Sequence, residues 1–107
     1  VVSSSIQLTP NRVYVASPTF EITSSNNVIF GLNYSLSGSM NIQLPLISDV
    51  GNMQCTFKDE HGNAAINNIH LLSSGSDLID GEVSQSLGRD YISISLYNNS
   101  TNKWFIH

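Results

Sequence analysis

Residues 28–36 read Val-Ile-Phe-Gly-Leu-Asn-Tyr-Ser-Leu, and every second side chain from Val28 to Leu36 is apolar. Alternation with a period of two is typical of a β-strand that turns one face to a core and the other to solvent. The same alternation recurs in residues 40–46, 53–58 and 92–97. Because helical spacing of apolar residues is missing almost everywhere, the sequence predicts an all-β fold with no substantial helix.

Shorter segments extend this pattern along the chain. The further strand candidates are Arg12–Ala16, Thr19–Thr23, Ile69–Leu72, Glu82–Leu87 and Lys103–Ile106. Turn-forming residues at 48–52, 59–63 and 98–102 separate neighbouring strands and are typical of hairpins. We therefore expect about eight strands in an antiparallel, jelly-roll-like β-sandwich built from hairpins. Pro45 cannot donate a ladder hydrogen bond, so we place its strand at a sheet edge or at a bulge.

The composition indicates one small domain over residues 1–107, in which residues 1–10 are expected to lead in from a preceding segment. Of the 107 residues, 18 are Ser and 12 are Asn, whereas only 11% are charged. An ordinary soluble domain has about 25% charged residues. The surface must therefore be covered mostly by hydroxyls and amides, while the 40% of apolar residues can fill a core.

Several classes of function are excluded by the same composition. The four basic residues are scattered along the chain and cannot neutralise a run of phosphates, so we expect no nucleic-acid partner. No apolar run approaches the roughly 18–20 residues that span a bilayer, so we expect no membrane partner. The single cysteine, Cys55, excludes an internal disulfide and a cysteine zinc cluster.

Patterns that point to catalysis or metal binding are weak. No G-x-S-x-G motif is present, and with 18 serines some Ser and His proximity arises by chance, so we predict that the protein is not an enzyme. Acidic residues gather in 59–61 and 77–82 without the spacing of a calcium loop, and we expect solvated carboxylates in turns there. His70 is interpreted as an ordinary strand residue and Cys55 as a buried thiol. The sequence thus predicts no catalytic residue, metal ligand or cofactor.

Aromatic side chains are the candidate contact residues, namely Tyr34, Tyr91, Tyr97 and Trp104. Tyr91 and Tyr97 alternate with the apolar residues of 92–96 and so lie on the opposite face of their strand. Exposed tyrosines bury a large area at low entropic cost, and they suit either a sugar-stacking site or a subunit interface. We favour an interface or a core position over a sugar site.

The second half of the chain carries an ordered series of motifs. In order, they are Leu44-Pro45, Phe57–Ala64, Asn67–Leu71, Ser74–Gly81, Tyr91–Tyr97 and Asn102–Ile106. This series resembles a β-rich module of bacteriophage tail-fibre and tail-spike proteins and of structural proteins of large DNA viruses, over residues 44–107. The chain departs from that module at residues 98–101, where the family often has a Gly-containing turn.

The resemblance implies an all-β module on the exterior of a virion, commonly assembled as a homotrimer around a fibre axis, and it brings no catalytic residues. We therefore expect a non-enzymatic fibre, spike or capsid decoration domain that oligomerises and mediates attachment to a host. Its expected partners are further copies of the chain, other virion proteins and a host-surface glycan. A monomeric carbohydrate-binding module is the alternative.

Overall fold

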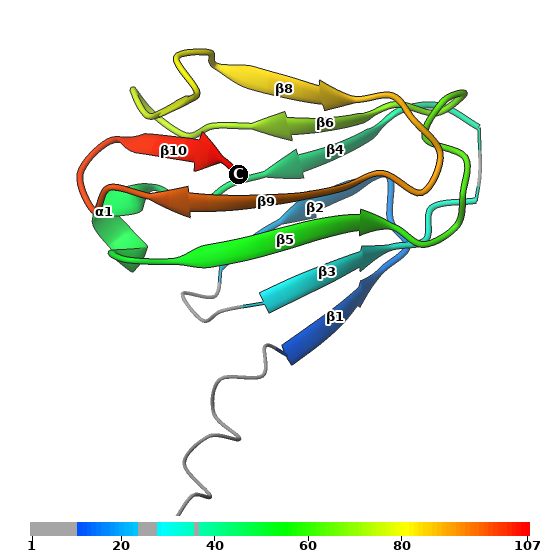
Figure 1. Ribbon diagram of the computed structural model, residues 1–107, viewed down its shortest axis with the longest axis horizontal. Coiled ribbons are helices and arrows are strands. Elements are labelled where there is room, and N and C mark those ends of the chain that lie inside the picture. Colours follow the sequence, from blue (N-terminus) through cyan, green and yellow to red (C-terminus); the bar gives the residue numbers. More distant parts are fainter. Residues whose placement is uncertain (1–10, 24–27, 36) are drawn as a thin grey trace, which may run out of the picture.

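A computed structural model describes residues 11–23, 28–35 and 37–107 of the chain. Ten strands and one four-residue helix make up this part of the protein (Figure 1). The strands are β1 (Asn11–Val15), β2 (Thr19–Glu21), β3 (Val28–Leu32), β4 (Met40–Gln43), β5 (Gln54–Asp59), β6 (Ile69–Leu72), β7 (Leu78–Ile79), β8 (Ser84–Leu87), β9 (Ser93–Asn98) and β10 (Lys103–Ile106), and the helix is α1 (Ile47–Val50). The prediction of an all-β fold is confirmed, whereas the expected lead-in over residues 1–10 lies outside the described residues.

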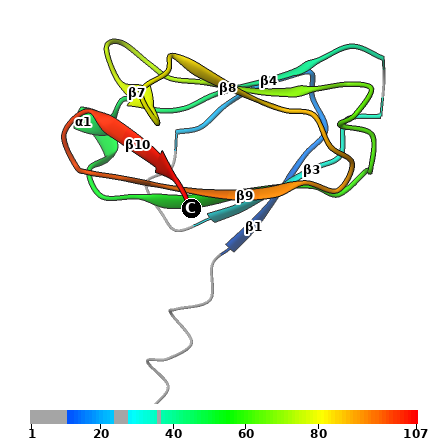
Figure 2. The same ribbon diagram turned by 45° about the horizontal axis from the view of Figure 1, so that its top comes forward.

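The strands form two sheets that pack face to face (Figure 2). Sheet A has the order β1-β3-β5-β9-β10-β7 and sheet B has the order β2-β4-β6-β8. From β1 to β8 the chain changes sheet after every strand, so that strands adjacent in sequence lie in opposite layers. Strands that are neighbours in a sheet therefore come from successive turns of the chain, and the winding is solenoid-like.

Most of the predicted hairpins were wrong for this reason. The segments 48–52 and 59–63 each carry the chain from one sheet to the other, and only 98–102 closes a hairpin, between β9 and β10. The pairs β1/β3, β3/β5, β2/β4, β4/β6 and β7/β10 are parallel. An antiparallel jelly-roll built from hairpins does not describe this arrangement. Period-two alternation fixes which face of a strand is buried, but it does not fix the strand with which it pairs.

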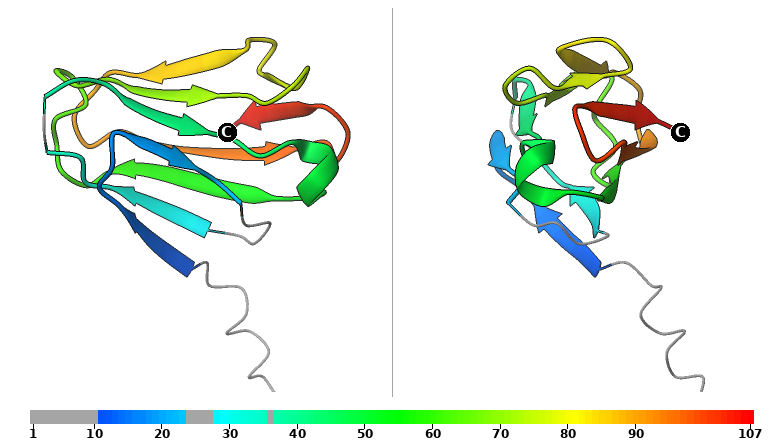
Figure 3. Two further views of the ribbon diagram at one scale, coloured as in Figure 1. Left: turned by 180° about the vertical axis from the view of Figure 1, so that it is seen from behind. Right: turned by 90° about the vertical axis from the view of Figure 1, so that its left-hand side faces the viewer.

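Pro45 has a different role from the predicted one. Its strand, β4, ends at Gln43 and lies between β2 and β6 inside sheet B, not at an edge. The ladder ends where Leu44 donates its N–H to Leu72 O, at 2.8 Å, because Pro45 has no N–H to continue it. The chain then forms α1, which lies across one end of the space between the sheets (Figure 3).

Antiparallel strands close the far side of the stack. β9 pairs antiparallel with β5, and β8 pairs antiparallel with β6. Among the described residues, the outermost strands of the sheets, β1 and β2 at one side and β7 and β8 at the other, are each paired on one side only. The two sides differ in the direction of pairing, because β1 and β2 end the stack of parallel strands and β8 pairs antiparallel with its neighbour.

The core lies between the sheets and is built from the inward-facing residues of successive turns. Phe30 stacks on Phe57 of the neighbouring strand, with ring centroids 5.3 Å apart, and Phe20 of the opposite sheet packs at 5.7 Å from Phe30. Trp104, on β10, is fully buried in the same apolar cluster. Burial of large side chains of this kind contributes about 1.5–3 kcal/mol each, so the alternation seen in the sequence is what holds the two sheets together.

Candidate functional site

The four aromatic residues singled out from the sequence occupy two different environments. Trp104 is fully buried and Tyr34 nearly so, and the Tyr34 hydroxyl donates to Ser37 O at 3.2 Å. Tyr91 and Tyr97 are exposed, at 59% and 45% of their surface. Of the four residues only these two are exposed, and the structure places them in separate regions of the surface, whereas Tyr14 on β1, which the sequence interpretation did not select, is exposed as well.

Tyr97 belongs to a group that we call the aromatic patch, formed by Tyr97, Phe105 and His107. The Tyr97 ring lies 5.3 Å from Phe105 and meets His107 edge-on at 5.1 Å. Gln54, the partner of Tyr97 on β5, lies beside the patch with its Nε2 3.5 Å from His107 Nε2. The patch covers the outer face of sheet A at β9 and β10, where rings and hydrogen-bonding groups are presented together.

Tyr91 lies in the turn before β9 rather than on the strand. Its φ is 61°, in the left-handed region. Its carbonyl accepts a hydrogen bond from Lys58 Nζ at 2.5 Å, and the Lys58 ammonium lies 5.8 Å from the ring centroid. The ring covers Gly62, where a Cβ would collide with it. Tyr91 therefore joins two loops and is not part of the aromatic patch.

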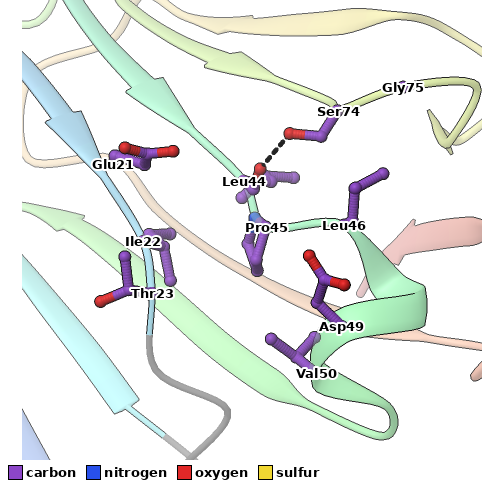
Figure 4. Close-up of a pocket in the computed structure, with 10 residues that line it drawn as sticks. All are labelled: Glu21, Ile22, Thr23, Leu44, Pro45, Leu46, Asp49, Val50, Ser74 and Gly75. Atoms are coloured by element: carbon purple, nitrogen blue, oxygen red, sulfur yellow. Dashed lines mark hydrogen bonds between the residues drawn. The ribbon is translucent and has the colours of Figure 1, made fainter.

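A first hollow, of about 340 Å³, lies at the end of the molecule that carries α1 (Figure 4). The side chains of Glu21 and Asp49 lie on either side of it in this view, with Pro45 between them. On its far wall, the Ser74 hydroxyl donates to Leu44 O at 2.5 Å, which ties the loop after β6 to the end of β4. No basic residue is among the described residues that line the hollow.

A second hollow, of about 380 Å³, lies on the outer face of sheet B and shares Glu21 with the first. Its lining comes from β2, β4 and β6, and it includes Phe20, Asn41 and Gln43. The Gln43 amide is held firmly, because its Nε2 donates to Ser73 O at 2.9 Å and to Ser74 Oγ at 2.7 Å. We call the two hollows together the β2–β4 groove.

Asp59 is a buried carboxylate that the sequence interpretation placed in a solvated turn, and this expectation was wrong. Its side chain is 1% exposed. Oδ1 accepts the N–H of Gly62 at 3.0 Å, and Oδ2 accepts the N–H groups of Ala64 at 3.0 Å and Tyr91 at 3.1 Å. One side chain thus joins the loop after β5 to the loop before β9. The alternation offered a signal for it, because Asp59 continues the buried face of Cys55 and Phe57.

Two further buried polar residues hold the end with α1. Asp77, 5% exposed, accepts the N–H of Ile47 at 2.9 Å, which is an otherwise unpaired donor at the start of the helix. Asn98, 7% exposed, donates to Gly51 O at 2.9 Å, just after the helix. The expectation of solvated carboxylates over residues 77–82 was therefore wrong for Asp77, whereas Asp80 and Glu82 are exposed.

Glu60 forms the one ion pair among the described residues. Its carboxylate accepts from Arg12 Nη2 at 2.5 Å and Nε at 3.0 Å, and from Asn33 Nδ2 at 2.8 Å. The hydrogen bond from Arg12, followed by that from Asn33, lowers the pKa of Glu60 to about 2. The carboxylate lies over Gly31, which leaves room for it because it has no side chain. This pair fastens β1 to the end of β5 across β3.

Other candidate chemistry is limited in the part of the chain that the structure describes. Cys55 is fully buried, as expected, and burial raises the pKa of its thiol to about 12. His70 Nδ1 lies 2.8 Å from Ser86 Oγ on the outer face of sheet B. No group of three or more His, Cys, Asp or Glu side chains is placed to hold a metal ion among the described residues. Within the same residues, no helix has the length and apolar character needed to cross a membrane.

Comparison with known proteins found no family model that matches the chain and no matching curated protein. The resemblance of residues 44–107 to tail-fibre and large DNA virus modules therefore gains no support from these comparisons and stays a prediction. Three features of the surface can contact other molecules: the aromatic patch, the β2–β4 groove and the open edges of β1 and β2.

Proposed function

We propose that this chain is a non-enzymatic structural module of a virion, part of a fibre, spike or capsid decoration, that oligomerises and attaches the particle to a host. The observation that carries the proposal is the stacking of parallel turns that end in the open edges of β1 and β2. Stacked turns of this kind form extended, quasi-one-dimensional bodies, and their exposed edges need a neighbouring element to cover them.

The outer face of sheet A supports self-association in particular. The aromatic patch is flanked on β5 and β9 by Gln54, Thr56 and Ser95, and the hydroxyls of the last two lie 2.8 Å apart. Burying rings and neutral polar groups avoids the large desolvation cost of burying charge. Aromatic residues are also enriched at interfaces between proteins. A homotrimer around a fibre axis, in contact with other virion proteins, is the assembly that we favour.

The oligomeric state in solution tests this proposal. Light scattering coupled to size-exclusion chromatography should give a trimer mass, and Tyr97→Glu should shift it to the monomer while the fold is retained. Ile66→Glu is the matched control, because Ile66 is 85% exposed and lies in the loop after β5, away from the patch. A strictly monomeric mass over a wide concentration range would overturn the assembly part of the proposal.

A monomeric carbohydrate-binding module is the second candidate, and the make-up of the aromatic patch favours it. Tyr97 offers a ring face for a sugar, and Gln54 and His107 beside it offer hydrogen-bonding groups. Under this function, Tyr97→Ala should weaken glycan binding without unfolding the domain. A broad glycan array that shows no binding at all would exclude it.

A further inference from the structure

The β2–β4 groove is a candidate binding site separate from the aromatic patch. The two hollows share Glu21, and together they run from the outer face of sheet B to the end of α1. Each hollow, at about 340 and 380 Å³, lies within the roughly 300–1,000 Å³ typical of ligand sites. Because the aromatic patch lies on the outer face of sheet A, the groove lies in the opposite layer of the sandwich.

The groove combines free carboxylate acceptors with a few groups that can both donate and accept, namely the Asn41 amide and the hydroxyls of Thr19 and Thr23. The carboxylates of Glu21 and Asp49 make no hydrogen bond or ion pair with any other described residue, and they remain able to accept. The donors of Gln43 and Ser74 are already used on Ser73 O and Leu44 O. A ligand that matches this lining must therefore bring several donors of its own.

The charge of the groove disfavours anionic ligands. The basic residues lie elsewhere: Arg12, Lys58 and Lys103 are on strands of sheet A, and Arg89 is in the loop before β9. None of them is among the residues lining either hollow. A carboxylate or sulfate on a ligand would meet Glu21 and Asp49 with no cation between them, which disfavours binding.

Apolar groups lie between these acceptors and give the ligand a surface on which to pack. Pro45 and Leu46 contribute to the first hollow, and Leu72 contributes to the second, whereas the Phe20 ring packs inward against Phe30 and only borders it. A sugar ring has both features that this lining requires, since its hydroxyls donate to carboxylates and its C–H face packs on apolar side chains. Hydrogen bonds from a hydroxyl to a carboxylate are short and roughly twice as strong as those between neutral groups.

We propose that the β2–β4 groove binds a neutral oligosaccharide, with one sugar unit in each hollow and Glu21 between them. This rests on the attachment part of the proposed function and names the class of ligand and its place. The groove is formed by β2, β4, β6 and α1 of a single chain, so ligand binding and oligomeric mass can be measured separately.

Calorimetric titration of the purified protein with neutral hexose di- to tetrasaccharides tests the proposal. Each probe is paired with an otherwise equal oligosaccharide that carries one uronic acid. We expect at least one neutral probe to bind, with a disaccharide at least tenfold tighter than its monosaccharide and tighter than its acidic pair. Glu21→Ala and, separately, Asp49→Ala should each weaken binding by tenfold or more, whereas the double variant Glu21→Gln/Asp49→Asn should reduce the preference over the acidic pair.

Glu82→Ala is the matched control, since Glu82 is exposed and lines neither hollow, and it should leave the affinity unchanged. Absence of binding by every neutral probe would overturn the proposal. Equal affinity for acidic probes, or binding that survives Glu21→Ala and is lost in Tyr97→Ala, would overturn it as well. The oligomeric mass, measured on the same samples, reports the assembly separately, so the two failures can be told apart.

Discussion

The two ends of the sandwich are held by buried polar side chains in different ways. At the end formed by the loops 60–68 and 88–92, one carboxylate, Asp59, accepts three backbone N–H groups from two loops. At the end that carries α1, Asp77 accepts one N–H at the start of the helix, and Asn98 donates to Gly51 O after it and accepts the N–H of Ser100. The first end depends mainly on one carboxylate, to which Asp90 adds a single bond from the N–H of Ala65 at 2.9 Å, whereas the second distributes its contacts and leaves space for the β2–β4 groove.

The two ends of the sandwich should therefore differ in how well they tolerate substitutions. Where the chain leaves one sheet and enters the other, backbone N–H groups have no strand partner. Asp59 accepts three of these N–H groups, so all three depend on one side chain. Near α1 each polar contact satisfies a single group, and the loss of one leaves its neighbours in place. We therefore expect damage at the Asp59 end to be larger than equivalent damage at the α1 end.

The largest effect is expected for Asp59→Ala. Removing the carboxylate leaves three N–H groups without their acceptor, and we expect the free energy of unfolding to fall by about 3 kcal/mol. Urea unfolding followed by the emission of the single tryptophan, the buried Trp104, measures it. A loss below about 1 kcal/mol would show that water replaces Asp59 without cost and would remove the asymmetry between the ends.

A smaller difference is expected between Gly62→Ala and Gly81→Ala. Both glycines have φ in the left-handed region, at 86° and 83°, where a side chain costs about 1–2 kcal/mol. A Cβ at Gly62 would also collide with the Tyr91 ring, whereas nothing lies within 4 Å of one at Gly81. Unfolding curves should therefore show Gly62→Ala as the less stable variant. Equal losses would mean that the Tyr91 ring moves aside freely.

Asp77→Ala should cost less than either change near Asp59. It removes the single acceptor of the Ile47 N–H, and we expect a loss of about 1 kcal/mol in the free energy of unfolding. Hydrogen exchange of the Ile47 amide should accelerate, while the amides of Ala64 and Tyr91 at the other end should keep their rates. Faster exchange at both ends would show that the two regions are coupled.

The smallest effect is expected for the Arg12–Glu60 ion pair, whose contribution to stability should depend on pH. The folded pKa of Glu60, about 2, is below the ordinary value of 4.5, so its contribution is complete above about pH 4.5 and is lost as the pH falls toward 2. The stability difference between the native chain and Glu60→Gln should shrink over that range and stay level above it. Because both side chains are partly exposed, the difference should also decrease in high salt. If the stability difference between the native chain and Glu60→Gln did not change with pH, the low pKa of Glu60 would be contradicted.

The strands were predictable because each depends only on local alternation. Residues 40–43 and 93–98 alternate between core and surface whatever strand lies beside them. The pairing was not predictable, because Asn11 pairs with Val28, 17 residues on, whereas Val28 pairs with Cys55, 27 residues on. Turns of such unequal length leave no repeat in the sequence. In addition, these parallel strands alternate between buried and exposed residues, a pattern that is more usual in antiparallel sheets.

The candidate sites, like the strand pairing, could be predicted from the sequence only in part. Tyr97 could be selected from its place on the polar face of its strand, but Phe105 and His107 join it only through the pairing of β9 with β10. The β2–β4 groove combines residues as distant as Thr19 and Gly75, and no local pattern in the sequence shows that they lie together. Asp59 carried a local signal, a carboxylate in phase with a buried face, whereas its partner Tyr91 is 32 residues away.

The order of the strands also governs how the protein forms as it is synthesised. β5 must wait for β9 before its second edge is paired, and the intervening residues include β6, β7 and β8. During synthesis, the second edge of β5 therefore stays unpaired until β9 has left the ribosome. Such long-range pairing slows folding and exposes strand edges to other nascent chains. The time that separates the emergence of β5 from that of β9 therefore affects how much of the protein folds without aggregating.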